Sequence, residues 1–172
     1  TLSGEIVHQF AVFGSKIIQI GCYGGLQKNI KVGDFLIASE VKALDGVSGF
    51  YQKSTNQIKP STKLLDALEK EITNQKIPYF KEKLISSPTM LGESMKIINE
   101  WSKQGFFGVD MESASTIAIA NHFNVDSASI LYLFDLVIQG QTVLDKNTDD
   151  QKIRKLRDKQ MMNIVFNVIS QY

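Results

Sequence analysis

The segment GVDMESASTIAIANHFNVDSASILYLFD, residues 108–135, places a strand, a helix and a second strand in direct succession. Residues 106–111 form a short β-rich run, residues 112–123 are rich in Ala and Ile, and residues 127–137 read as a long apolar strand. Strands that are apolar throughout are typical of a parallel sheet that helices cover on both faces. The segment therefore predicts an α/β fold.

On both sides of this segment the chain keeps alternating between strands and helices. We expect strands at 16–21, 34–41 and 78–87, and helices at 2–13, from 62 onward, at 95–105 and at 151–170. The intervening turn at 22–26 and the loops at 44–61 and 138–150 are rich in Gly and polar residues. The expected inner side of the last helix is apolar: Leu156, Met161, Ile164, Val165, Val168 and Ile169. This order predicts a single domain over residues 1–172, a three-layer α/β/α fold with a central mixed, largely parallel sheet.

Composition narrows the classes of partner. The chain has 172 residues, 43% of them hydrophobic, and a net charge of +1, so nothing predicts nucleic acid or an anionic membrane as a partner. Cys22 is the single cysteine, which excludes a disulfide within the chain and favours a reducing, cytoplasmic setting. We find neither a signal peptide nor an apolar run of membrane-spanning length. The chain opens on TLSGEIVHQFAVFG, and we expect an N-terminal segment to be missing.

Three strand ends are the candidate ligand site, because ligands of such sheets bind at the carboxyl ends of strands. They are Gly21–Gly25, Asp110–Glu112 and Phe134–Val137. Bare glycine backbone could hold a phosphate, a Met thioether could lie against a sugar ring, and a Glu carboxylate could accept hydrogen bonds from two hydroxyls. An Asp after an apolar strand could share a proton with a leaving group. Together these groups suit the cleavage of the glycosidic bond of a nucleoside.

Other chemistries find little support. The nucleophile elbow of serine hydrolases is absent, and His8 and His122 lie on expected helices, where a structural or solvent-facing role is the simpler interpretation. Neither a pair of cysteines nor a His-x-x-x-His pattern is present, so no metal site is predicted. Simpler roles remain open for the candidates themselves: Glu112 as a charge at a helix N-terminus, Met111 as core, Asp135 as a cap and Cys22 as a small buried residue.

Two segments, KIIQIGCYGGLQKNIKVGDFLIASE (16–40) and residues 108–135, resemble the nucleoside phosphorylase family, which includes purine nucleoside phosphorylases, uridine phosphorylases and nucleosidases. The resemblance implies that the chain holds the C-terminal two-thirds of that fold, with ribose on Met111 and Glu112 and with Asp110 near the sugar or base. It also implies that Gly24 lines the phosphate and base sites and that Asp135 protonates a purine base. Met90 takes the place of the usual base-stacking aromatic, and Glu93 lies where uridine phosphorylases recognise uracil.

The chain departs from the family pattern where phosphate would bind. Gln19 replaces the usual arginine, and Cys22 replaces a hydroxyl residue, so both are only weak phosphate-binding candidates. Losing a charge-assisted hydrogen bond to phosphate costs about 1.5–3 kcal/mol of binding free energy. The resemblance implies a nucleoside phosphorylase that uses inorganic phosphate and a purine or uridine nucleoside, needs no cofactor and forms a homo-oligomer, either a dimer or a hexamer. A nucleosidase that uses water and a truncated, non-catalytic nucleoside-binding relative remain as alternatives.

Overall fold

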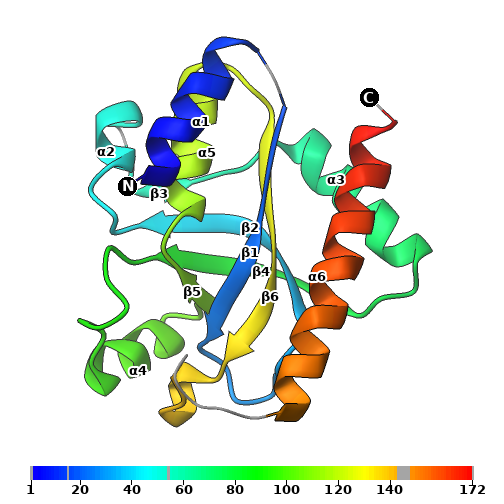
Figure 1. Ribbon diagram of the computed structural model, residues 1–172. Helices are drawn as coiled ribbons and strands as arrows, with labels where there is room; N and C mark the ends of the chain where they lie inside the picture. The colour runs from blue at the N-terminus through cyan, green and yellow to red at the C-terminus, as the bar shows by residue number, and fades with distance from the viewer. Residues whose placement is uncertain (1, 15, 54, 143–147, 172) are drawn as a thin grey trace.

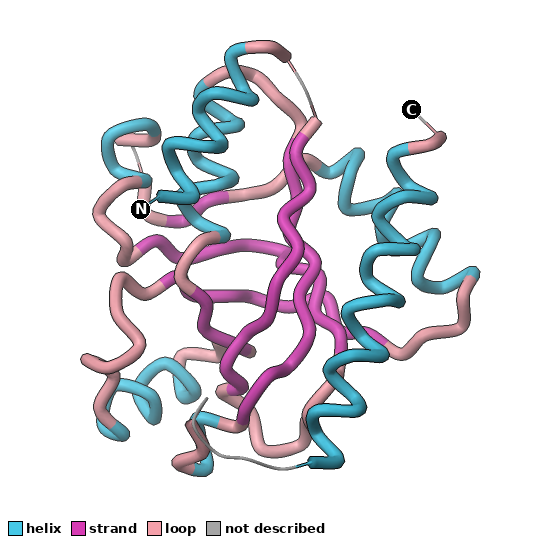
Figure 2. Tube along the Cα trace, in the orientation of Figure 1, coloured by secondary structure: helices cyan, strands magenta, loops and turns pink. Residues whose placement is uncertain are grey.

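The computed structural model describes residues 2–14, 16–53, 55–142 and 148–171. All the strands and helices expected from the sequence are present, and from the second strand onward they alternate along the chain (Figures 1 and 2). The strands are β1 (Ile17–Gly25), β2 (Phe35–Ala43), β3 (Gln57–Ile58), β4 (Tyr79–Ser86), β5 (Gly108–Asp110) and β6 (Ser127–Asp135). The helices are α1 (Leu2–Val12), α2 (Ser48–Tyr51), α3 (Thr62–Asn74), α4 (Met95–Lys103), α5 (Ser113–His122) and α6 (Thr148–Ile169), with a short 3-10 turn, η1, at Val137–Gln139.

The strands form one mixed sheet in the order β3-β2-β4-β5-β1-β6. The long pairings, β1 with β6 and β2 with β4, are parallel, which confirms the prediction of a mixed, largely parallel sheet. An additional antiparallel pairing joins β2 to β6 and closes the sheet on itself. The three-layer description therefore holds only in the sense that helices lie on two sides of a barrel-like sheet.

Two groups of helices cover this sheet. Helix α1 packs on α5 on one side, and α3 and α6 pack together on the other (Figure 1). Residues Ser113 to Ala120 of α5 are all buried, as expected for a helix whose side chains are small or apolar. Because β5 leads into this buried helix over only two residues, the β5–α5 junction is held firmly against the sheet.

The predicted turn at 22–26 is wrong, because β1 continues as a strand through Gly25. The glycines there allow close strand contact instead of a reversal of the chain. A Cβ on Gly24 would lie 2.9 Å from Val137, and one on Gly108, in the neighbouring strand β5, would lie 2.3 Å from the ring of Tyr23. Glycine permits an approach that any side chain would block.

Smaller differences concern the loops and the last helix. The expected loop at 44–61 contains the short helix α2 and strand β3. Helix α6 begins at Thr148, and residues 143–147 of the expected loop at 138–150 lie outside the described residues. Met161, Ile164, Val165 and Val168 are buried as predicted, whereas Leu156 and Ile169 are 52% and 55% exposed. In the described part of the chain no helix is both long and apolar enough to cross a membrane.

Candidate functional site

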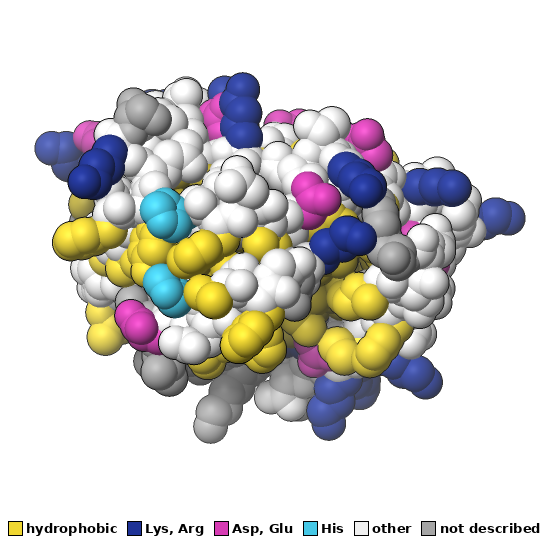
Figure 3. Space-filling view, turned by 90° about the horizontal axis from the view of Figure 1, so that it is seen from above, with side chains coloured by type: hydrophobic (Ala, Val, Ile, Leu, Met, Phe, Trp, Pro, Cys, Tyr) yellow, Lys and Arg dark blue, Asp and Glu magenta, His cyan; other side chains and the backbone are white. Residues whose placement is uncertain are grey.

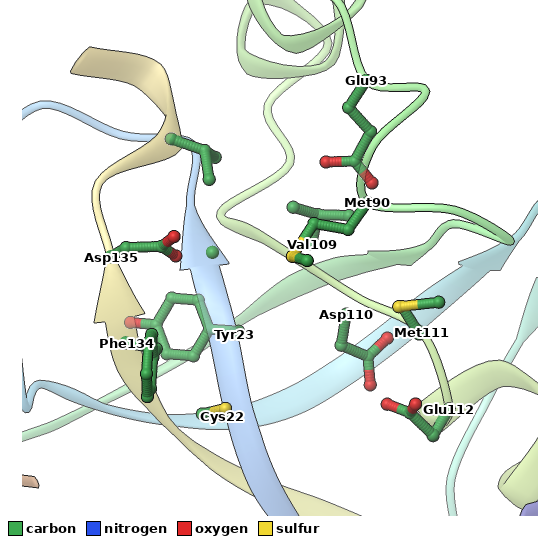
Figure 4. A pocket seen from close by; sticks show the side chains of 12 residues that line it. Cys22, Tyr23, Met90, Glu93, Val109, Asp110, Met111, Glu112, Phe134 and Asp135 are labelled. Atoms are coloured by element: carbon green, nitrogen blue, oxygen red, sulfur yellow. The ribbon is translucent and has the colours of Figure 1, made fainter. Parts of the chain in front are cut away.

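The ends of β1, β5 and β6 and the loop after β4 enclose a cavity of about 190 Å³ (Figure 4). Eight of the nine candidate site residues line it. They are Gly24, Cys22, Met90, Glu93, Asp110, Met111, Glu112 and Asp135. Gln19 is outside this set, and it lines a neighbouring groove between β1 and α1. The structure therefore brings the strand ends together as the sequence suggested.

Asp110 ties the end of β5 to the start of α5. Its carboxylate accepts hydrogen bonds from the Ser86 hydroxyl at 2.5 Å and from the backbone N–H of Ser113 at 2.9 Å, and Ser86 in turn accepts from the N–H of Ala114 at 2.9 Å. Burial raises the pKa of Asp110, against the opposing effect of these hydrogen bonds. Because Asp110 satisfies an N–H in the first turn of α5, the capping role belongs to this residue and not to Glu112.

The side chains of Met111 and Glu112 line the cavity and take no part in capping α5. The Glu112 side chain makes no capping hydrogen bond, and its carboxylate points toward Asp110 across the wall of the cavity (Figure 4). Burial, and then the charge of Asp110, raise the pKa of Glu112. Beside it, the thioether of Met111 supplies an apolar wall. A carboxylate next to a soft apolar surface suits a ligand that has hydroxyls on one edge and a hydrocarbon face.

Phe134 and Asp135 both reach the cavity because β6 bulges there. The register shifts between Tyr23 and Gly24 of β1, so that Tyr23 pairs with Leu133 and Gly24 pairs with Asp135. In a regular strand consecutive side chains point to opposite faces, and a bulge re-aims them. Behind the bulge, the Arg154 guanidinium lies 3.6 Å from the centre of the Phe134 ring and donates to the Phe134 carbonyl at 2.8 Å. Arg154 thus fixes the residue that precedes Asp135.

Met90 and Glu93 come from the loop after β4. The loop is held by its own hydrogen bonds, with Ser87 donating to the Thr89 carbonyl at 3.1 Å and Gly92 N–H donating to the Thr89 hydroxyl at 3.2 Å. Burial raises the pKa of Glu93, and the nearby charge of Asp135 adds to this shift. Glu93, next to Met90, and Asp135, across the cavity, therefore influence each other electrostatically (Figure 4).

The β1 side of the site differs from the prediction for phosphate. The Gln19 amide accepts from the Ser129 hydroxyl at 2.8 Å and donates to Asp110 at 3.5 Å, so its polar atoms are engaged within the protein. Cys22 is exposed, so it is not the small buried residue that the sequence allowed. Partial desolvation by the surrounding protein, followed by the charges of Asp135 and Glu112, raises the pKa of its thiol to about 11, which keeps the thiol neutral. No Lys or Arg lines the cavity among the residues that the structure describes.

The two histidines lie together on another face, among hydrophobic side chains (Figure 3). His8 Nδ1 is 3.0 Å from the Tyr51 hydroxyl, and both His8 and His122 make edge contacts with the ring of Phe123. Neither lines the cavity. Within the described ranges, no group of three or more His, Cys, Asp or Glu side chains could hold a metal ion.

Four further residues line the cavity without a role of their own predicted from the sequence: Tyr23, Val109, Phe134 and Val137. Tyr23, Phe134 and Val137 lie within the predicted strand ends Gly21–Gly25 and Phe134–Val137, and Val109 directly precedes the third strand end, Asp110–Glu112. The bulge that turns Phe134 toward the cavity cannot be read from the local sequence, because it depends on the pairing of β6 with β1.

Comparison with known proteins places the chain in a family. The family model described as the phosphorylase superfamily matches residues 6–170. A DeoD-type purine nucleoside phosphorylase of Clostridium beijerinckii is 23% identical over 169 residues, covering 98% of this chain and 68% of its own length. A DeoD-type enzyme of Thermoanaerobacter sp. is 25% identical, covering 94% of this chain and 65% of its own.

Solved structures show the same fold. A uridine phosphorylase from Vibrio fischeri superimposes with a TM-score of 0.88 at 21% identity, covering 99% of this chain and 70% of that one. A Plasmodium knowlesi homologue of the P. falciparum purine nucleoside phosphorylase gives 0.81 at 18% identity. The chain spans about two-thirds of the length of the relatives it matches. With nearly its whole length matching the family model, the chain belongs to the phosphorylase superfamily.

Proposed function

We propose that this protein is a nucleoside phosphorylase that binds a purine or uridine nucleoside in the cavity and breaks its N-glycosidic bond with inorganic phosphate. One observation carries the proposal: Met111 and Glu112 lie on one wall of the same cavity that receives Asp135 from another. Glu112 would accept hydrogen bonds from the ribose hydroxyls while Met111 lies against the ring. The base would then lie between Met90 and Asp135.

In the reaction, the bond between ribose C1′ and the base nitrogen breaks, and its electron pair leaves with the base. A proton donated by Asp135 to a purine would let the base leave as a neutral molecule. The positive charge that develops on the ribose would be stabilised by the Glu112 carboxylate. A phosphate oxygen would complete the bond to C1′ and give ribose 1-phosphate. The names of the relatives support this reaction, and we propose that it needs no cofactor.

A hydrolytic reaction is the second candidate, because the lining residues that the structure describes include no cation to hold phosphate. The internal hydrogen bonds of Gln19 add to this argument. Water would then take the place of phosphate. Binding of a nucleoside without cleavage is the third candidate, favoured by the same lack of a cation among the described lining residues. Assembly as a homo-oligomer, either a dimer or a hexamer, stays a prediction.

Base release from inosine, adenosine and uridine, followed with and without phosphate, tests the proposal. We expect phosphate-dependent release, with ribose 1-phosphate as the second product. Equal release without phosphate would replace phosphorolysis by hydrolysis. Binding without any release would leave only the non-catalytic role, and neither binding nor release would overturn the proposed site.

Asp135→Asn is the matched variant, because it keeps the size of the side chain and removes its acid. Loss of a general acid typically lowers the rate about 100-fold or more. We expect that loss in the release of purine bases, while the dissociation constant for the nucleoside changes by only a few fold. An unchanged rate of release would remove Asp135 from the reaction.

A further inference from the structure

A second cavity, of about 330 Å³, adjoins the first at only one of its ends. Both cavities are lined by Met90, Glu93, Asp135 and Val137. None of the residues assigned to the sugar, and neither Cys22 nor Gly24, reaches the second cavity. The second cavity therefore extends the site beyond the base, on the side away from the ribose.

The far part of this second cavity is mainly apolar. Its own lining residues are Leu91, Met95, Ile98, Gly140, Gln141 and Thr142. The wall at α4 is fixed by Ser94, whose hydroxyl accepts from the N–H of Ile97 at 3.4 Å and caps the helix. The Gln141 side-chain carbonyl accepts from the Leu136 N–H at 3.0 Å, which orients the opposite wall. Flexible thioethers such as that of Met95 adapt to ligands of different shape.

The neck between the cavities carries two carboxyl groups. Figure 4 shows Asp135 across the cavity from Met90 and Glu93, with the carboxyl groups of Glu93 and Asp135 turned toward the space between them. Carboxylates accept hydrogen bonds and favour donors. No Lys or Arg side chain lines either cavity in the described ranges. A ligand that passes through the neck is therefore best matched by an N–H group at that point and by hydrocarbon beyond it.

We propose that the preferred substrates are nucleosides whose base carries a secondary amine with an apolar substituent. The amine N–H would donate to Glu93 or Asp135 at the neck, and the substituent would occupy the second cavity. An unsubstituted base would leave that cavity to water. This inference rests on the proposed function, because it takes the ribose end of the site to be Met111 and Glu112.

Calorimetric titration with adenosine, N6-methyladenosine and N6-benzyladenosine tests the inference, together with base release from each. We expect the dissociation constant to fall along this series, by about tenfold from adenosine to the benzyl compound, because apolar surface is buried in the second cavity. Adenosine that binds as tightly as the benzyl compound, or more tightly, would overturn the inference and leave the proposed function standing. If none of the three nucleosides binds, both are wrong.

Met95→Trp should fill the second cavity without touching the first, because Met95 lines only the second. We expect this variant to lose the preference for the benzyl compound and to keep the affinity of the parent for adenosine. Met162→Trp on α6 is the control, since Met162 is exposed and lines neither cavity. Thermal unfolding of both variants establishes that they are folded. A Met95→Trp protein that is folded and keeps the full preference would contradict the proposed position of the substituent.

Discussion

Two walls of the cavity differ in their chemistry: the β5 side, formed by Asp110, Met111 and Glu112, and the β1 side, formed by Cys22 and Gly24 with Gln19 nearby. They are linked by a hydrogen bond of 3.5 Å from the Gln19 amide to the Asp110 carboxylate. At β5, one buried carboxylate takes over the capping of α5, so that Met111 and Glu112 are available to a ligand. At β1, the side chain in the position of the expected phosphate arginine is a neutral amide whose hydrogen bonds go to the protein itself.

This difference shows where the chain keeps features of a nucleoside site and where it departs from them. The β5 side has a carboxylate, an apolar wall and a rigid support. The β1 side offers glycine backbone and a neutral thiol. The sugar and base ends of the proposed site are therefore better supported than the phosphate end.

The largest expected effect on stability comes from Gly108→Ala, which disrupts the packing of β5 against β1. The new Cβ would lie 2.3 Å from Cδ2 of Tyr23, a ring that is 1% exposed and cannot move aside. We expect the free energy of unfolding to fall by about 3 kcal/mol in chemical denaturation. Gly49→Ala in α2 is the control, because a Cβ there meets nothing within 4 Å. Equal stability of the two variants would show that β1 and β5 are not packed as described.

Asp110→Ala should remove the support at the end of β5, together with the weak contact to Gln19. The Ser113 N–H and the Ser86 hydroxyl would lose their acceptor in a buried position. We expect a loss of about 1–3 kcal/mol in the free energy of unfolding. Asp66→Ala on the exposed face of α3 should change stability by no more than about 0.5 kcal/mol. An Asp110→Ala variant with the same free energy of unfolding as the parent would mean that the start of α5 is held by other contacts.

Acid should weaken nucleoside binding on the β5 side. Burial and the charge of Asp110 raise the pKa of Glu112 above its usual 4.5. Protons compete with the ribose hydroxyls for this carboxylate, so the dissociation constant should begin to rise at a pH above 4.5 as the pH falls. Calorimetry between pH 7.5 and 4.5 measures the effect. Affinity that stays constant over this range would show that the ionised carboxylate is not required.

The smallest effect concerns Cys22 on the β1 side. Partial desolvation and the charges of Asp135 and Glu112 raise its pKa from 9.0 to about 11, and the thiolate is the reactive form. At neutral pH the ionised fraction of Cys22 is about 100-fold lower than that of a free thiol of pKa 9.0, but its thiolate is more nucleophilic. Alkylation by iodoacetamide should therefore be about tenfold slower than that of a free cysteine. A rate equal to that of the free thiol would show that Cys22 has an activated thiolate.

Much of the β5 side could be predicted from sequence, because Asp110, Met111 and Glu112 are neighbours at the end of an apolar run. Asp135 follows the same logic at the end of β6. The state of Gln19 could not be predicted, since its partners Asp110 and Ser129 lie 91 and 110 residues away in the chain. The closure of the sheet by β2 and β6 and the bulge at Phe134 likewise depend on pairing between distant strands.

Titration of adenosine into the parent protein and into Glu112→Gln tests the central claim most directly. The substitution keeps the shape of the side chain and removes the charge that would hold the ribose hydroxyls. A hydrogen bond to a charged group contributes about 1.5–3 kcal/mol, so we expect affinity to fall by a factor of about 10 to 100. Unchanged affinity in a folded Glu112→Gln protein would contradict the assignment of the β5 side to the sugar.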